Sequence, residues 1–327
     1  MAALLSSIRA SAFLAAPAPA ERRVGRTLVT VALATLAAVV AGVVAVVLVA
    51  LAAALLIAVT GSADFAGPHG RLDITGLLLA GVRPGRPLVS YILDLAIVGS
   101  ASIAVALAFL AVCARRAGRA MASFATSAPR FRWRHAVIGL CVFLPVVALE
   151  IGLASRVAGG GGDAAPIAQP GAPFGARLAY ALAAVGFLWL AALSEELLFR
   201  GWMLQQTHAL TRRVAVVIAV NAVLFSLAHG DQTLGGFITR CAMGAGWAWV
   251  VLRLGGVEFT AGAHLANNLG IALLGQPVVL ASRPEPGDPF SVALQVGSLA
   301  GLVLGVEAWL RWRKPGQTPD AAIAALP

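Results

Sequence analysis

The chain has 327 residues, of which 60% are hydrophobic and only 12% are charged, and its mean hydropathy is +0.89. These values exclude an ordinary soluble enzyme, so we expect an integral membrane protein. The net charge of +10 is assigned to topology and to contact with anionic lipid headgroups, because no nucleic-acid-binding motif is found. The expected partners include the lipid bilayer and no nucleic acid.

About eight stretches of the sequence are long and apolar enough to cross a bilayer as helices. Their hydrophobicity is continuous rather than alternating, which favours an all-α, polytopic helix bundle over a membrane β-barrel. Lys and Arg gather in the loops on the side of the N-terminus, which predicts that both termini lie in the cytoplasm. The expected spans are residues 27–60, 89–113, 136–155, 178–204, 213–230, 236–253, 257–275 and 291–311.

Composition divides the chain into five segments. The N-terminal segment is expected to be a mobile cytoplasmic arm or a retained anchor, because a long span follows it directly. In the last span, Gly297, Gly301 and Gly305 share one face and predict close helix packing. The segments are a cytoplasmic N-terminal arm (1–26), an N-terminal transmembrane scaffold (27–157), a Gly- and Pro-rich loop (158–177), a polar functional core (178–275), and the last span with its C-terminal tail (276–327).

The stretch ALSEELLFRGWML, residues 192–204, places two carboxylates and an arginine in the fourth expected span. Mostly apolar residues precede it, so we expect one helix to run straight through this stretch. Residues four apart share a helix face, which predicts an ion pair between Glu196 and Arg200. Glu195 lies about 100° further around the helix, so the two carboxylates should not point to one spot. An intramembrane carboxylate without a local partner indicates a functional site.

Polar side chains on two other spans are candidates to meet Glu195. His229 lies near the end of the fifth span, and His264 and Asn268 share one face of the seventh. With a rise of about 1.5 Å per residue, Glu195 and His229 lie within about one helical turn of the same depth. The sequence therefore predicts a site built from three spans of the second half of the chain.

Three short motifs follow one another in this half of the sequence. They are EExxxR at Glu195, Glu196 and Arg200, FxxxH at Phe225 and His229, and HxxxN at His264 and Asn268. Together they resemble the signature of the CPBP family of intramembrane proteases, the CAAX proteases and bacteriocin-processing enzymes, also called the Abi family. This family is related to the type II CAAX prenyl endopeptidase.

The resemblance implies an intramembrane endopeptidase and a role for each motif residue. Glu195 and His229 would activate a water molecule, while His264 and Asn268 would hold the oxyanion. Proteolysis requires such a base and such donors. The supporting residues would be Glu196, Arg200 and Phe225.

A metal-dependent mechanism uses the same side chains. Glu195, His229 and His264 are of the types that bind zinc and leave a position open for water, which would make the protein a metalloprotease. The zinc-binding pattern HExxH is absent from the sequence. From the sequence, zinc remains an open alternative, and no other cofactor is expected.

The substrate is expected to be a membrane-associated peptide or protein. Abundant Ala, Gly, Val and Arg with little Lys is typical of a GC-rich bacterial genome, so the expected location is the bacterial cytoplasmic (inner) membrane. Two rival hypotheses are a proton-coupled carrier, which would show paired inverted halves, and a non-proteolytic immunity-type scaffold. Asp94, Glu150 and Arg240 lie within or beside spans without an assigned role beyond buried pairing, or a substrate path in the case of Arg240.

Overall fold

The protein is all-helical in the part described by its computed structural model. That part comprises residues 12–17, 19–60, 88–157, 165–230, 233–275 and 288–312. Within it, the one pairing of strand type is an isolated bridge between Thr126 and Gly256. The expected all-α class is therefore confirmed.

Each of the eight expected spans is a helix. The long helices are α3 (Val24–Thr60), α5 (Leu88–Ala117), α6 (Trp133–Val157), α7 (Phe174–Glu195), α9 (Val214–Ala228), α10 (Leu234–Leu254), α11 (Glu258–Leu274) and α12 (Pro289–Trp312). The short elements are α2 (Ala12–Ala15), η1 (Pro19–Arg22), η3 (Met121–Phe124), η4 (Pro166–Ala168), the π-helix η5 (Glu196–Met203) and α8 (Leu204–Thr211).

Five helices in the described part are long and apolar enough to cross a membrane, so the protein is an integral membrane protein. They are α3, α5, α6, the continuous helix from Phe174 to Thr211, and α12. The expected count of eight spans is not confirmed, because α9 has 15 residues, α11 has 17, and the 21-residue α10 is not among the five apolar helices. A straight crossing takes about 20 residues. The cytoplasmic placement of both termini stays a prediction.

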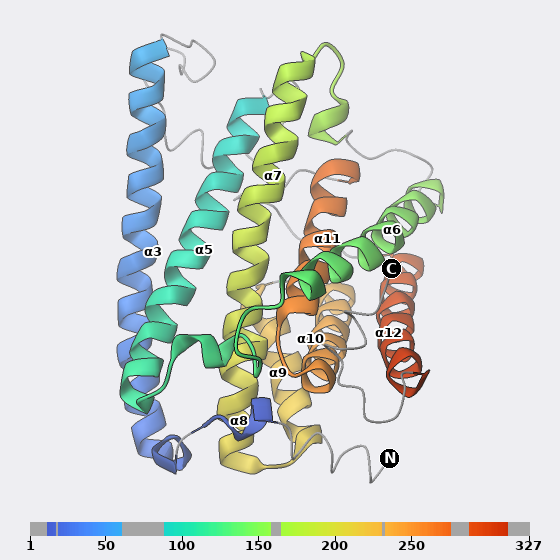
Figure 1. Ribbon diagram of the computed structural model, residues 1–327. Coiled ribbons are helices and arrows are strands. Elements are labelled where there is room, and N and C mark those ends of the chain that lie inside the picture. Colours follow the sequence, from blue (N-terminus) through green and yellow to red (C-terminus); the bar gives the residue numbers. More distant parts are fainter. Residues whose placement is uncertain are drawn as a thin grey trace.

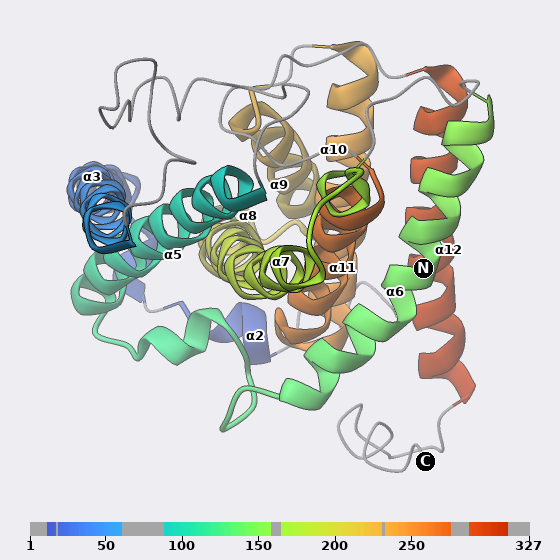
Figure 2. The same cartoon turned by 90° about the horizontal axis from the view of Figure 1, so that it is seen from above.

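The helices form a row that begins with α3 at one edge and continues through α5 and α7 to α11 (Figure 1). Helix α6 runs obliquely between α11 and α12, and α9 and α10 pack on one side of the row (Figure 2). Much of α3 faces outward with exposed Leu and Val side chains, as expected of a lipid-facing helix. This arrangement leaves the middle of the bundle to helices α7, α9, α10 and α11.

The described part of the N-terminal segment packs against the helices, and its assignment as a cytoplasmic arm or a retained anchor stays a prediction. Phe13 and Leu14 are buried in the core, at 1% and 2% exposure. Glu21 forms an ion pair with Arg119 at 3.2 Å, and its carbonyl oxygen accepts a hydrogen bond from Gln206 at 2.7 Å. This segment therefore packs against α8, at the end of the long helix that begins with α7.

The expectation that the glycines of α12 allow close packing of a neighbouring helix was wrong. A Cβ atom added at Gly297, Gly301 or Gly305 would meet no atom within 4 Å. Instead, Gly301 and Gly305 line an apolar groove of about 560 Å³ between α6 and α12. The small residues of α12 thus leave space beside a neighbouring helix instead of bringing its backbone close.

Close backbone contact occurs between α6 and α11. A Cβ atom at Gly262 would lie 1.8 Å from the carbonyl oxygen of Ala136, and one at Gly139 would lie 2.0 Å from that of Phe259. Only glycine permits this approach, because the obstacle is backbone that cannot turn aside. The crossing fixes the position of α11, which carries His264 and Asn268 of the predicted site.

We predict that Gly139→Ala and Gly262→Ala each destabilise the fold by about 1–3 kcal/mol or more, because the added methyl overlaps backbone. The matched control is Gly152→Ala in α6, where nothing lies within 4 Å. That change should be neutral or stabilise by up to about 1 kcal/mol, as expected for alanine in a helix. Thermal unfolding in detergent measures the difference, and equal melting temperatures for all three variants would contradict the close crossing.

Candidate functional site

The charged stretch at the centre of the site is π-helical. The helix is continuous from Phe174 to Thr211, as expected, but Glu196–Met203 forms i to i+5 hydrogen bonds. The side-chain amide of Asn221 donates to the carbonyl oxygen of Phe199 at 2.6 Å, which satisfies one backbone acceptor of this widened turn. A Cβ atom added at Gly201 would overlap the carbonyl oxygen of Phe124, so the glycine lets these two segments approach closely. π-Helical turns inside α-helices often mark functional sites.

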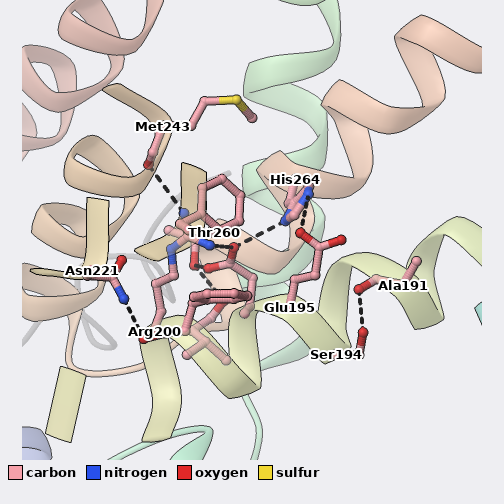
Figure 3. A network of polar contacts seen from close by, with 12 residues as sticks. Ala191, Ser194, Glu195, Arg200, Asn221, Met243, Thr260 and His264 are labelled. Carbon is pink, nitrogen blue, oxygen red and sulfur yellow. Dashed lines mark hydrogen bonds and ion pairs between the residues drawn. The ribbon is translucent and has the colours of Figure 1, made fainter. Parts of the chain in front are cut away.

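Glu196 is fully buried and has three polar partners. Its Oε1 forms an ion pair with Arg200 at 3.1 Å, which confirms the predicted pair four residues apart. Its Oε2 accepts a hydrogen bond from the Thr260 hydroxyl at 2.7 Å. The Nδ1 atom of His264 lies 3.1 Å from Oε1. Glu196 therefore joins the helix that begins with α7 to α11 through side chains. Figure 3 labels its three partners, Arg200, Thr260 and His264.

Arg200 is also fully buried, among aromatic rings. Its guanidinium carbon lies 3.9 Å from the ring centre of Phe225 and 5.2 Å from that of Trp247. Its Nη2 donates to the carbonyl oxygen of Met243 at 3.4 Å. These cation–π contacts and the pairing with Glu196 compensate for removing the cation from water.

Glu195 lies between the two predicted histidines. Its Oε2 is 3.6 Å from Nε2 of His229 and 3.7 Å from Nε2 of His264. His264 is almost fully buried, with 3% of its side chain exposed, whereas Glu195 and His229 retain 29% and 28%. Three helices thus bring these side chains together, as the sequence predicts. The two distances exceed a direct hydrogen bond and suit a bridging group between the partners.

Both histidines have their Nδ1 atom facing an acceptor. Nδ1 of His229 lies 2.8 Å from the carbonyl oxygen of Phe225, and Nδ1 of His264 faces the carboxylate of Glu196. A carbonyl oxygen or an ionised carboxylate only accepts, so each Nδ1 carries the proton. In the neutral imidazole, each Nε2 is then an acceptor directed at Glu195.

The two glutamates diverge, as expected, but they share one partner. Adjacent residues on a helix point in different directions, and both side chains nevertheless contact His264. Glu195 approaches Nε2 and Glu196 approaches Nδ1 of the same ring. The two nitrogens face opposite sides of the imidazole, so a single ring from α11 can lie between carboxylates that diverge from the neighbouring helix.

The histidines border a cavity of about 380 Å³. Asn268 lines it as well, and its Oδ1 accepts a hydrogen bond from Nδ2 of Asn267 at 3.2 Å. Glu195 does not itself line the cavity but touches two residues that do. A small molecule or peptide in the cavity would therefore approach Glu195 past the imidazoles. Other lining residues include Glu150, Thr239, Arg240, Ser291 and Gln295.

Several site residues were missed in the sequence. Thr260 precedes His264 by four residues, so the spacing that joined His264 to Asn268 could also have identified it. Trp247 packs against the His264 ring with centroids 4.5 Å apart, but nothing in the sequence distinguishes it from a lipid-facing tryptophan. Asn221 lies mid-helix in α9, where a polar residue in an apolar run was a usable signal.

Glu258 and Arg132 were also overlooked as a pair. Glu258 is fully buried at the start of α11, and its Oε2 lies 2.6 Å from Nη2 of Arg132. Nη1 of Arg132 also donates to the carbonyl oxygen of Leu254 at 3.1 Å. These contacts tie the segment before α6 to the turn between α10 and α11. The contacts of Arg132 hold in place the N-terminal end of α11, which precedes His264.

The site contains side chains of the kinds that bind zinc, but not in the arrangement of a zinc centre. Glu195, His229 and His264 provide suitable atoms, and a proton on each Nδ1 leaves Nε2 able to bind a metal. Within the described residues, however, no group of three or more His, Cys, Asp or Glu side chains has the arrangement of a metal site. The geometry here does not fit a preformed zinc centre, and no catalytic step is derived through a metal.

Breaking the buried pair should destabilise the protein. We predict that Glu196→Gln and Arg200→Met each lower the free energy of unfolding by about 3–5 kcal/mol, because each leaves one buried charge unpaired. The double variant should lose less than the sum of the two. Denaturant or thermal unfolding in detergent measures this non-additivity. Strictly additive losses would show that the two side chains do not depend on each other.

Comparison with known proteins supports the predicted resemblance. A 103-residue stretch is 27% identical to the "Uncharacterized protein YyaK" of Bacillus subtilis (strain 168), and the match covers 27% of this chain and 34% of the relative. The chain thus spans about a third of the length of that curated relative. No solved structure matches significantly. Residues 177–270, which contain all three motifs, match the family model "Type II CAAX prenyl endopeptidase Rce1-like", so this part of the chain is identified as similar to CAAX-type membrane peptidases.

Proposed function

We propose that the protein is an intramembrane endopeptidase that hydrolyses a peptide bond of a membrane-associated peptide or protein. The observation that carries this proposal is the carboxylate of Glu195 between the Nε2 atoms of two histidines. An acceptor-rich space of this kind suits a water molecule, which can donate to the carboxylate and to one imidazole at once. The similarity of residues 177–270 to CAAX-type peptidases supports the same reaction class.

In the first step, Glu195 removes a proton from the water molecule, and the water oxygen attacks the carbonyl carbon of the scissile peptide bond. His229 orients this water through Nε2, and its own orientation is fixed by the Phe225 carbonyl oxygen. The carbonyl oxygen becomes an oxyanion. General-base catalysis by a positioned group typically contributes about 10²–10⁴-fold to the rate.

His264 and Asn268 are the proposed donors to that oxyanion. Since Nδ1 of His264 faces the carboxylate of Glu196, donation from Nε2 requires the imidazolium form, in which both nitrogens carry protons. Asn268 would donate through Nδ2, because its Oδ1 is engaged by Asn267. The proton held by Glu195 then passes to the leaving nitrogen, and the carbon–nitrogen bond breaks.

The remaining residues act by holding these groups in place. Glu196 fixes the ring of His264, and Thr260 and Arg200 fix Glu196. Phe225 supports Arg200 by its ring and His229 by its carbonyl oxygen. Positioning of this kind matters because catalytic groups must be held to within a fraction of an ångström.

Substitution of the proposed catalytic residues tests the reaction directly. We predict that Glu195→Gln, His229→Ala and His264→Ala each lower cleavage of membrane peptides by at least about 10²-fold while the protein still accumulates in the membrane. The control is His208→Ala, which replaces a histidine of α8 that is not part of the motifs. Cleavage is measured by mass spectrometry with purified protein in bilayers. Full activity of Glu195→Gln would exclude it as the base.

The zinc alternative is separated by metal removal. If Glu195 activates water without a metal, activity should survive treatment with a strong chelator and dialysis, and metal analysis should show less than one equivalent of zinc. Activity lost on chelation and restored by zinc would assign Glu195, His229 and His264 to a metalloprotease site. Absence of cleavage under both conditions would favour the carrier or immunity-type scaffold.

A further inference from the structure

The catalytic cavity contains a carboxylate that the proposed reaction does not use. Glu150 lies on α6 and lines the same cavity as His229, His264 and Asn268. Its Oε1 is buried and has no hydrogen-bond partner among the described residues. The hydroxyl of Ser298 is a hydrogen-bond partner of this carboxyl group, but the same hydroxyl also donates to the carbonyl oxygen of Gln295 at 2.9 Å. The carboxylate is therefore only weakly compensated within the protein.

Such a group is costly in a membrane protein unless a ligand compensates for it. A buried acceptor without a partner costs about 1–3 kcal/mol, and more when it is charged. Other acids in the bundle have partners: Glu196 pairs with Arg200, Glu258 with Arg132, and Glu307 with Arg253. Glu150 differs from them in facing a cavity that can admit a substrate.

A cationic and an acidic side chain from different helices line the cavity. Arg240 lines it from α10 and is electrostatically close to His229. From other helices, α6 contributes Glu150 to the lining, and α12 contributes Ser291 and Gln295. Ser291 donates to the exposed carboxylate of Asp288 from its amide, at 2.9 Å, and from its hydroxyl. These hydrogen bonds hold the pKa of Asp288 below its usual value, so it adds negative charge beside Ser291.

We propose that Glu150 is a specificity-determining residue that binds a positively charged group of the peptide substrate, an ammonium or guanidinium, at the α6–α12 side of the catalytic cavity. This inference rests on the proposed function, because it places the cation on the same peptide whose scissile bond lies near Glu195. The cation would approach Glu150 and stay away from Arg240, so the peptide would lie across the cavity in one direction. The cation is a Lys or Arg side chain or the α-amino group of the substrate.

Binding to the non-cleaving Glu195→Gln protein tests this inference without depending on catalysis. The probes are apolar peptides of about 20 residues, enough to cross a bilayer. Each carries one lysine, moved through the sequence, and is matched with a norleucine peptide of the same length. Dissociation constants are measured by fluorescence in lipid nanodiscs. Each peptide is used with a free and with an acetylated N-terminus, which separates a side-chain cation from the α-amino group.

We expect at least one lysine position, or the free N-terminus, to bind about 10- to 100-fold tighter than its neutral match, as for a hydrogen bond to a charged group. Adding Glu150→Gln, which keeps the shape of the side chain, should remove that difference. Adding Glu150→Lys should favour a glutamate peptide instead. Equal binding of charged and neutral peptides, or a preference that survives Glu150→Gln, would overturn the inference.

The same peptides distinguish a failure of the inference about Glu150 from a failure of the proposed function. If the wild-type protein cleaves the peptides without any preference that Glu150 controls, the endopeptidase assignment stands and the role of Glu150 is wrong. If cationic peptides bind through Glu150 but the wild-type protein cleaves none of them under any condition, the cavity is a cation-binding site and the proposed proteolysis is wrong.

Discussion

The buried ion pair between Glu196 and Arg200 is the interaction on which the rest of the site depends. Both side chains are fully buried, at 0% exposure, in a bundle whose outer surface is apolar. A charge in such surroundings is tolerated only when another charge and further hydrogen bonds compensate for it. Thr260, His264, Phe225 and the Met243 carbonyl oxygen provide this compensation from other helices. Removing one charge would leave the others without their partner.

The pair also determines which carboxylate is available for chemistry. Because Glu196 is occupied by Arg200, Thr260 and His264, its neighbour Glu195 is the acid that remains partly accessible and faces both imidazoles. The two glutamates are adjacent in sequence but perform different tasks. One organises the helices, and the other is the proposed base. His264 connects the two tasks, since its opposite ring nitrogens approach one carboxylate each.

The bundle concentrates polarity in a small volume. Helices α6 and α11 cross with glycines in contact with backbone, which brings α11 deep into the bundle beside α7. Helix α12 instead leaves a groove next to α6, although its glycines follow the spacing of a packing motif. Close contact thus fixes the helix that carries the proposed oxyanion donors. Other residues of α6 and α12, Glu150 among them, line the cavity.

The sequence by itself determined the helical class, the helices that form the site and the Glu196–Arg200 pair. These follow from hydropathy and from the four-residue spacing of a helix, which are local properties. It also singled out Glu195, His229 and His264 because polar groups are rare in apolar spans.

Only the tertiary structure decided how these groups meet. The π-helical turn at Glu196–Met203, the contact of both glutamates with one histidine, and the docking of Phe13 and Leu14 depend on packing between distant segments. The groove beside the glycines of α12 and the position of Glu150 in the cavity lining also depend on this packing. Helical periodicity fixes which face a side chain occupies, but the neighbour opposite that face is set by how helices far apart in the sequence pack.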